Sequence, residues 1–268
     1  MRNARWMMMT GALVILSSCI IPIYMDEGSR FGGNTAAFSK TIPFAPGGVL
    51  SVDNGLGDIV IRGWDRDELE VTAEETWADS SGRDVSIRLP RGNAVVPRVT
   101  VDASDRSVKI KARPRDPDLE DDRAVRLVIQ VPHDVELRDI AGRRGRIDIA
   151  DLYGRIRLDL EEGDVLVENF SGSLEADLIR GSIQAEILDS RPDDTVRLVL
   201  KQGTATVLLE PGFNGRIEAS APNGTVTSDF VVEPPLEGRR AAGTIGTGQG
   251  AMIIVSTLNG DVRLRKSK

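Results

Sequence analysis

The sequence predicts an all-β protein, specifically a right-handed β-solenoid with two short strands in each coil of roughly 18 residues. Three observations support this fold class. The composition combines 27 glycines with 4% aromatic residues, which suits thin β structures with aliphatic interiors. Five glycines follow one another at intervals of nine residues, from Gly145 to Gly181. Each begins a segment that alternates apolar and polar residues, which is the period of a β-strand.

Strands this short cannot form a core within one unit, so successive units must stack on one another. A β-sandwich with regular hairpins is the alternative fold.

Residues 1–18 are predicted to be a signal peptide. Two arginines precede the apolar run Trp6–Ile15, and Leu16-Ser-Ser-Cys19 follows it. This ending resembles the lipobox of bacterial lipoproteins, in which small residues separate a Leu from a Cys three positions later. The resemblance implies cleavage before Cys19 and lipidation of this residue, the one cysteine of the sequence. It also implies a cell-envelope location, and the non-acidic Ile20 favours the outer membrane.

Two other interpretations of this segment stay open. The stretch Trp6–Met25 carries no charged side chain before Asp26 and is long enough to span a bilayer as an uncleaved anchor. In a soluble secreted protein, Cys19 would be incidental.

Residues 19–47 are predicted to be a tether, because they mix Gly, Ser, Pro and charged residues without a sustained period. Residues 48–140 form an N-terminal β region, which is either the first coils of the solenoid or a separate module. Its alternating segments predict strands at Val49–Val52, Asp58–Arg62, Glu68–Thr76, Val85–Leu89, Val95–Val101, Ser107–Lys111 and Val125–Val131.

Residues 141–268 are predicted to be the repeat solenoid, built from the unit Gly-x-Ile-x-Ile and its variants. Glycine supplies a backbone corner that a β-carbon would obstruct. Four corners are Asn-Gly pairs, which suit turns with positive φ. These pairs are Asn54-Gly55, Asn214-Gly215, Asn223-Gly224 and Asn259-Gly260.

If two nine-residue strands form one coil, residues eighteen apart become neighbours on the same sheet. The inward-facing ladders are then Ile147 with Val165 and Ile183, and Ile156 with Leu174. On the outside, the same offset pairs Arg146 with Asp164 and Arg157 with Glu175. A nine-residue coil would instead place Arg146 beside Arg155, so opposite charges favour the longer coil.

Composition argues against several classes of function. The net charge of −7 disfavours nucleic-acid binding, which needs a basic surface. With one Cys and one His, we expect no catalytic site, no metal site and no cofactor, and we expect His133 to be structural or solvent-exposed. Trp64 and Trp77 are residue types that stack on sugar rings, although edge packing is their more common role.

Three segments resemble the family of bacterial "putative adhesin" domains of unknown function. They are Leu50–Gly63, the Gly-x-Ile-x-Ile array at 145–185, and the Gly-rich turn from Gly243 with the closing Ser256-Thr-Leu-Asn-Gly-Asp-Val-Arg-Leu264. The resemblance covers roughly residues 48–265 and implies a solenoid-like envelope protein without agreed catalytic residues.

We therefore expect a non-enzymatic lipoprotein, anchored to the membrane through Cys19, that presents its β surface for adhesion or for binding a protein or glycan. One alternative is a periplasmic scaffold or envelope-stress component. Another is a carbohydrate-active β-helix enzyme, which would show a cleft lined by charged residues on one sheet face.

Overall fold

The computed structural model describes residues 38–78, 84–85, 95–119, 122–189, 191–235 and 238–267. All of them belong to one compact unit, Asn34–Lys268. Cys19 and the predicted signal peptide lie outside the described residues.

The described residues form an all-β structure with one 3-10 helix, η1 (Pro117–Leu119), and without an α-helix, so the predicted all-β class is confirmed. In the same residues, no helix has the length and apolarity needed to cross a membrane. The strands are β1 (Phe38–Pro43), β2 (Gly48–Leu56), β3 (Ile59–Trp64), β4 (Glu68–Ala78), β5 (Asp84–Val85), β6 (Arg98–Ala103), β7 (Ser107–Arg113), β8 (Arg123–Pro132), β9 (Val135–Asp189), β10 (Thr195–Leu209), β11 (Gly215–Ser220), β12 (Val226–Ser228), β13 (Arg240–Ile245), β14 (Met252–Asn259) and β15 (Val262–Lys266).

The predicted strands between residues 48 and 140 coincide with β2, β3, β4, β6, β7 and β8. Of the predicted strand Val85–Leu89, only Val85 is described, in β5. The N-terminal region joins the repeats in one mixed sheet, because β2 and β3 both pair in parallel with β9. The predicted boundary between residues 140 and 141 falls inside β9.

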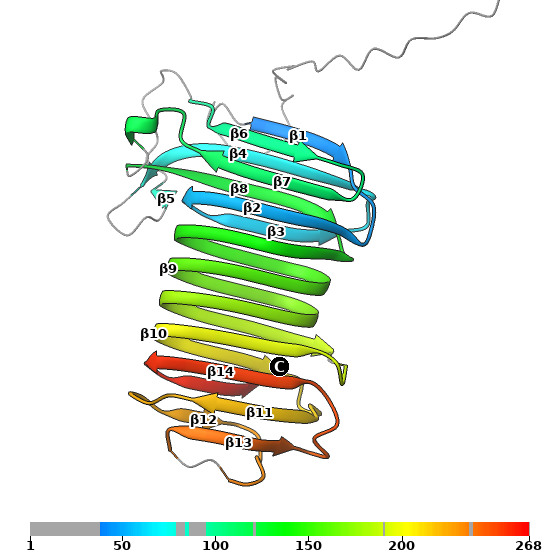
Figure 1. The fold of residues 1–268 in the computed structure, drawn as a ribbon, viewed down its shortest axis with the longest axis vertical. Coiled ribbons are helices and arrows are strands. Elements are labelled where there is room, and N and C mark those ends of the chain that lie inside the picture. The colour runs from blue at the N-terminus through cyan, green and yellow to red at the C-terminus, as the bar shows by residue number, and fades with distance from the viewer. Residues whose placement is uncertain are drawn as a thin grey trace, which may run out of the picture. The chain divides into compact units, whose positions relative to one another are not determined.

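Residues eighteen apart lie side by side along β9, which Figure 1 shows as a series of stacked turns. A β-carbon added at Gly163 would overlap the carbonyl oxygen of Gly145, and one at Gly172 would overlap that of Gly154. Hydrogen bonds with the same offset join side chains, as from Asn169 Nδ2 to Asp151 Oδ1 (2.9 Å). The predicted offset of eighteen residues is therefore confirmed in this region.

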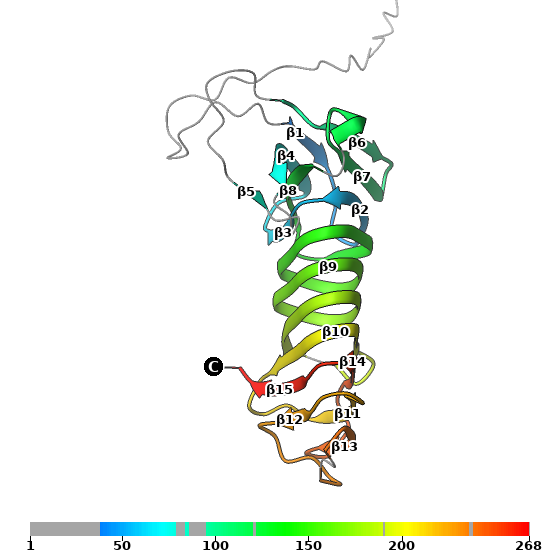
Figure 2. The ribbon, with the colours of Figure 1, turned by 90° about the vertical axis from the view of Figure 1, so that its left-hand side faces the viewer.

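The strands form two walls that meet at a column of glycines. Figure 2 shows the walls edge-on. Wall 1 begins with β1 and β5, which both pair with β4, and continues through β4, β8 and β3. It then takes in residues 145–152, 163–170 and 181–187 of β9, residues 203–209 of β10, and finally β15 and β12. Wall 2 consists of β6, β7 and β2, residues 135–144, 154–162 and 172–180 of β9, residues 195–202 of β10, and then β14, β11 and β13.

The inward side chains of both walls pack into one hydrophobic cluster, which is mostly aliphatic. The predicted inward-facing ladders are part of it, since their members are 1–2% exposed. Full burial of an aliphatic side chain contributes about 1.5–3 kcal/mol, so this cluster is the main source of stability. The ladder residues are Ile147, Val165, Ile183, Ile156 and Leu174.

The glycine column joins the walls and follows the order of the strands in space. Its members, from the β2–β3 end to the β12 end, are Gly57, Gly145, Gly163, Gly181, Gly203, Gly260 and Gly224. From Gly145 to Gly260 along this column, φ lies between 135° and 144°, a region that side chains rarely adopt.

The Asn-Gly prediction is wrong for three of the four pairs. Gly260 has a φ of 144°, whereas positive φ is not found at Gly55, Gly215 or Gly224. Gly55 lies inside β2, and the corner there is formed by Gly57, with a φ of 108°. Glycine is needed at positions 215 and 224 for another reason, because a β-carbon there would overlap a backbone carbonyl oxygen.

Part of the predicted tether belongs to the folded unit. Strand β1 pairs antiparallel with β4, with Phe38 opposite Ala73. Phe38 and Ile42 pack against the core, and Phe44 is fully buried. The predicted tether, residues 19–47, is thus corrected for residues 38–47, whose apolar side chains have a core to pack on.

The end of the chain departs from sequence order. Strand β14 lies between β10 and β11, and β15 lies between β10 and β12. The last strands of the sequence are therefore inserted between segments that precede them. Strand β13 then pairs antiparallel with β11 and ends wall 2.

Candidate functional site

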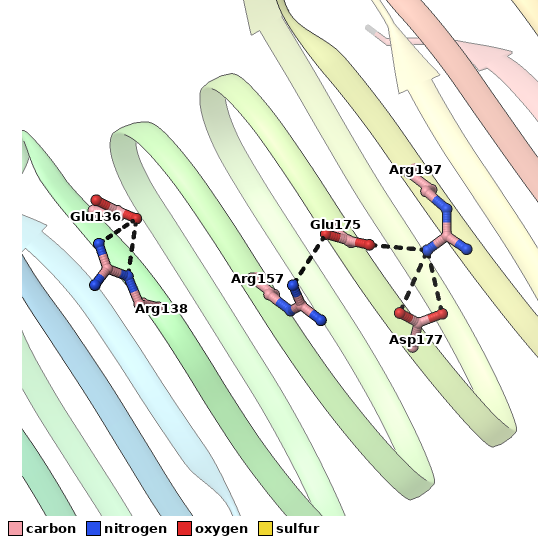
Figure 3. A network of polar contacts seen from close by, with 6 residues as sticks. All are labelled: Glu136, Arg138, Arg157, Glu175, Asp177 and Arg197. Carbon is pink, nitrogen blue, oxygen red and sulfur yellow. Dashed lines mark hydrogen bonds and ion pairs between the residues drawn. The ribbon is translucent and has the colours of Figure 1, made fainter.

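A row of opposite charges runs along the outer face of wall 2. We call Arg157, Glu175, Arg197 and Asp177 the charged ladder (Figure 3). Glu175 lies 3.8 Å from Arg157 Nη1 and 3.1 Å from Arg197 Nη1, and Arg197 Nη1 also lies 3.5 Å from Asp177. Each of these side chains is 38–55% exposed, so each pair contributes at most about 1 kcal/mol to stability. The ladder orders the charges of this face more than it stabilises the fold.

The repeat geometry places these residues together. Arg157 and Glu175 are eighteen residues apart, so the predicted pair is confirmed. Arg197 pairs in strand register with Glu175, although the offset here is 22 residues. The four extra residues fall in the connection from β9 to β10. A strict period of eighteen could not identify Arg197 as a member of the ladder.

Figure 3 also shows Glu136 and Arg138, which lie on the same wall nearer the N-terminal region. Arg138 donates from Nε and Nη2 to Glu136 Oε1, over 3.2 and 3.1 Å. The other predicted outward pair, Arg146 with Asp164, stays a prediction. Arg146 Nη2 lies 3.7 Å from Asp148.

Beside the ladder, Asp159 carries a carboxyl whose pKa is raised. Partial loss of solvent around this exposed residue's carboxyl is the main cause, and the charge of Asp177, eighteen residues further on, adds to it. The guanidinium of Arg157 opposes the shift. Asp159 therefore accepts a proton more readily than an isolated aspartate, whose ordinary pKa is 3.8.

A hollow of about 330 Å³ adjoins the same face at its glycine edge. Small residues, Gly55 and Ala141 among them, leave the space open, and charged groups surround it. Arg113 Nη2 donates to both carboxylate oxygens of Asp53, over 2.8 and 2.9 Å. Arg143 and Glu161 complete the charged lining. The hollow offers donors and acceptors of both signs to a polar ligand, and the sequence analysis did not anticipate it.

A second hollow, of about 400 Å³, lies near η1 and is lined by Glu75 and Arg123. Glu75 is buried, accepts a hydrogen bond from the backbone N–H of Arg115 (2.8 Å) and lies 3.5 Å from Arg123 Nη1. These contacts offset the free-energy cost of burying the Glu75 carboxylate, so a structural role explains its position.

The aspartates that follow corner glycines stabilise the stacking of turns. Asp164 Oδ1 accepts a hydrogen bond from the Ser182 hydroxyl (2.6 Å). Asp261 Oδ1 accepts from the N–H and hydroxyl of Thr225, over 3.1 and 2.8 Å, and these bonds lower the pKa of Asp261. Their oxygens are thus already engaged with the next turn.

The structure places His133 in the turn between β8 and β9, where its Nδ1 lies 2.6 Å from the carbonyl oxygen of Asp151. Among the described residues, no group of three or more His, Cys, Asp or Glu side chains is arranged to hold a metal ion. Cys19, the predicted lipidation site, lies in the undescribed N-terminal part.

No family model and no curated protein matches the chain. The chain is similar to the crystal structure of a "putative cell adhesion protein" from Clostridium sporogenes ATCC 15579, with 12% identity and a TM-score of 0.47 over 86% of this chain and 100% of that one. A "putative adhesin" from Bacteroides fragilis NCTC 9343 is 9% identical, with a TM-score of 0.30 over 86% of this chain and 97% of that one. A "putative lipid binding protein" from Parabacteroides distasonis ATCC 8503 is 8% identical, with a TM-score of 0.25 over 88% of this chain and 98% of that one. At these identities the similarities identify no family for the chain.

Proposed function

We propose that this chain is a non-enzymatic envelope lipoprotein that is anchored to a membrane through Cys19 and presents a β-solenoid surface for adhesion or for binding a protein or glycan. The observation that carries the proposal is the charged ladder on the outer face of wall 2, where neighbouring turns supply opposite charges. Such a face is ordered and solvent-accessible, and its charges are largely neutralised by one another.

The solenoid assignment is supported by the stacking of residues eighteen apart and by the parallel pairing of β9 with β10. In this assignment each coil contributes one strand to each wall, and the coil is right-handed, as crossovers between parallel strands almost always are. Stacked coils provide an extended surface without mobile loops, which suits a binding role.

The anchor is supported by the sequence Leu16-Ser-Ser-Cys19 after an apolar run. In this proposal the lipid on Cys19 holds the mature chain at the outer membrane, and residues 20–37 connect the lipid to the folded unit.

Phase partitioning tests the anchor. Full-length protein from cells is separated between detergent and aqueous phases, beside a Cys19→Ala variant. We expect the wild-type protein in the detergent phase and the variant in the aqueous phase or retained as unprocessed precursor. Identical partitioning of two processed proteins would overturn the lipid anchor.

Protease treatment of intact cells tests the exposed binding role, with a periplasmic protein as the control for lysis. Degradation of the wild-type chain while the control survives supports a role outside the cell. Full protection would overturn surface adhesion and favour the periplasmic scaffold or envelope-stress role.

One observation favours the carbohydrate-active alternative. Asp159, whose pKa is raised, lies next to Asp177 on a face that also carries the hollow lined by Arg113 and Glu161, and glycoside hydrolysis uses two carboxyl groups, one of which donates a proton. Assays for release of reducing ends from polysaccharides test this alternative. Release that is lost in Asp159→Asn would support it.

A further inference from the structure

Aromatic and polar side chains gather at one edge of wall 1, away from the charged ladder. Every Trp, Tyr or His whose side chain the structure describes lies here: Trp64, His133 and Tyr153. Aromatic residues make up only 4% of the sequence. We call these three, together with Asp65 and Arg66, the aromatic corner.

Contacts link the members of the aromatic corner in two groups, which are adjacent because Trp64, Asp65 and Arg66 follow one another in the chain. The rings of His133 and Tyr153 lie 5.7 Å apart, tilted by 35°. His133 Nε2 lies 3.3 Å from Asp65 Oδ1. Arg66 Cζ lies 4.6 Å from the centre of the Trp64 ring, and the Trp64 indole N–H donates to the carbonyl oxygen of Glu68 (2.9 Å).

The backbone of three successive layers holds this cluster in place. Tyr153 N–H donates to the carbonyl oxygen of His133 (2.8 Å). A β-carbon at Gly63 would overlap Asp151 O and lie 2.5 Å from His133 Nδ1, so glycine is required for the close approach. Asp151 itself has a φ of 62°, a left-handed conformation that is uncommon for a residue with a side chain. The backbone that carries His133 and Tyr153 is thus held in place by its own contacts.

The contacts of His133 indicate which of its ring nitrogens is left for a ligand. Because His133 Nδ1 lies 2.6 Å from a carbonyl oxygen, Nδ1 carries the hydrogen and donates it. Nε2 is then the atom presented beside Asp65, whose side chain is 99% exposed. Tyr153 is 53% exposed. An accessible ring therefore stands next to an accessible carboxylate and an imidazole nitrogen.

This combination matches the chemistry of a sugar. A pyranose ring has a face of C–H groups that packs on an aromatic ring, and a rim of hydroxyls that both donate and accept hydrogen bonds. Tyr153 supplies the ring at low entropic cost, since it has two side-chain torsions. Asp65 accepts hydrogen bonds and Arg66 donates them. The Asp65 carboxylate and the net charge of −7 disfavour an acidic sugar.

We propose that the aromatic corner binds a neutral hexopyranose unit of a polysaccharide, stacked on Tyr153 and hydrogen-bonded by Asp65 and His133 Nε2. This inference deepens the proposed function, since it rests on the binding role and names a ligand class, but it does not depend on the lipid anchor.

Affinity electrophoresis tests the proposal with the full-length chain in a detergent that lacks a sugar headgroup. Native gels contain dextran, mannan, laminarin, xyloglucan or hydroxyethyl cellulose, and migration is compared with gels without polysaccharide. We expect at least one polysaccharide to retard the wild-type protein. Tyr153→Ala should bind it at least about tenfold more weakly, whereas Tyr153→Trp, which keeps an aromatic ring, should retain binding.

Leu258→Ala is the matched control, because Leu258 is also 53% exposed and lies in β14 on wall 2. It should migrate like the wild type, and circular dichroism should show all variants folded. Retardation that survives Tyr153→Ala would overturn the aromatic corner while leaving a glycan-binding role elsewhere on the protein. If no polysaccharide retards the wild type, the sugar site is overturned, and the proposed function is then judged by partitioning and protease exposure alone.

Discussion

A β-carbon added to Gly163 would overlap the carbonyl oxygen of Gly145, eighteen residues earlier in the chain. The same relationship recurs between Gly181 and Gly163, and between Gly172 and Gly154 in the alternating positions. The nine-residue spacing of these glycines therefore reflects the close approach of backbones in successive turns, in addition to the positive φ at each corner.

Gly163→Ala is predicted to destabilise the protein by more than about 3 kcal/mol, because it combines a strained φ of 139° with a backbone overlap. Urea unfolding followed by circular dichroism measures the effect. Gly212→Ala is the control, since a β-carbon there has no atom within 4 Å. That variant should be neutral or more stable by up to about 1 kcal/mol. Equal losses for the two variants would contradict the close approach as the cause.

Asn54→Ala is predicted to cost about 1–3 kcal/mol. The buried Asn54 Nδ2 donates to the carbonyl oxygen of Val125 (2.7 Å) and connects β2 to β8 across 71 positions of sequence. Removing this donor leaves a buried carbonyl oxygen with one partner fewer. Asn223→Ala removes an exposed amide contact to Asn259 (2.9 Å) and should change stability by less than about 0.5 kcal/mol. Thermal unfolding of both variants checks the difference, which would disappear if Asn54 were not part of the core.

The coupling between Arg197 and Glu175 is predicted to be about 0.2–1 kcal/mol at low salt, as for other exposed ion pairs. A double-mutant cycle with Arg197→Gln and Glu175→Gln, measured by urea unfolding, gives this value. In about 1 M NaCl, where the screening length is about 3 Å, the coupling should largely vanish. A coupling that persists unchanged at high salt would show that the two side chains interact mainly through packing.

Asp159→Asn is predicted to stabilise the protein at neutral pH by a small amount, within about 0.5 kcal/mol. The folded-state pKa of Asp159 is raised, so just above its ordinary value of 3.8 the folded chain holds a proton that the unfolded chain has lost. Stability from this group is therefore present at low pH and lost as pH rises through the raised value. The advantage of the variant should shrink when unfolding is repeated well below pH 3.8. A variant that is less stable than the wild type at neutral pH would contradict this sign.

The charged ladder shows which side-chain contacts the eighteen-residue period can predict. The offset of eighteen residues identifies the contact between Arg157 and Glu175, because both lie within uninterrupted repeats. The same offset does not predict the contact of Arg197 with Glu175, because four extra residues precede β10. The strand register is restored where the aliphatic residues of β10 stack on those of β9. The aromatic corner is harder still to predict from the sequence. Its members come from the end of β3 and the turn after it, from the turn between β8 and β9, and from β9, and no single repeat spacing relates them.

The sequence by itself determined the all-β class, most of the strands and the eighteen-residue stacking from Gly145 to Gly181, because alternation and glycine spacing are local properties of the chain. Only the tertiary structure decided which units are neighbours near the C-terminal end, where β14 and β15 lie between β10 and the earlier strands β11 and β12. The physical reason is that every repeat carries nearly the same pattern of glycine and aliphatic residues, so many strand pairings satisfy it equally. The choice among them depends on the burial and edge pairing of the whole stack, which no single unit encodes.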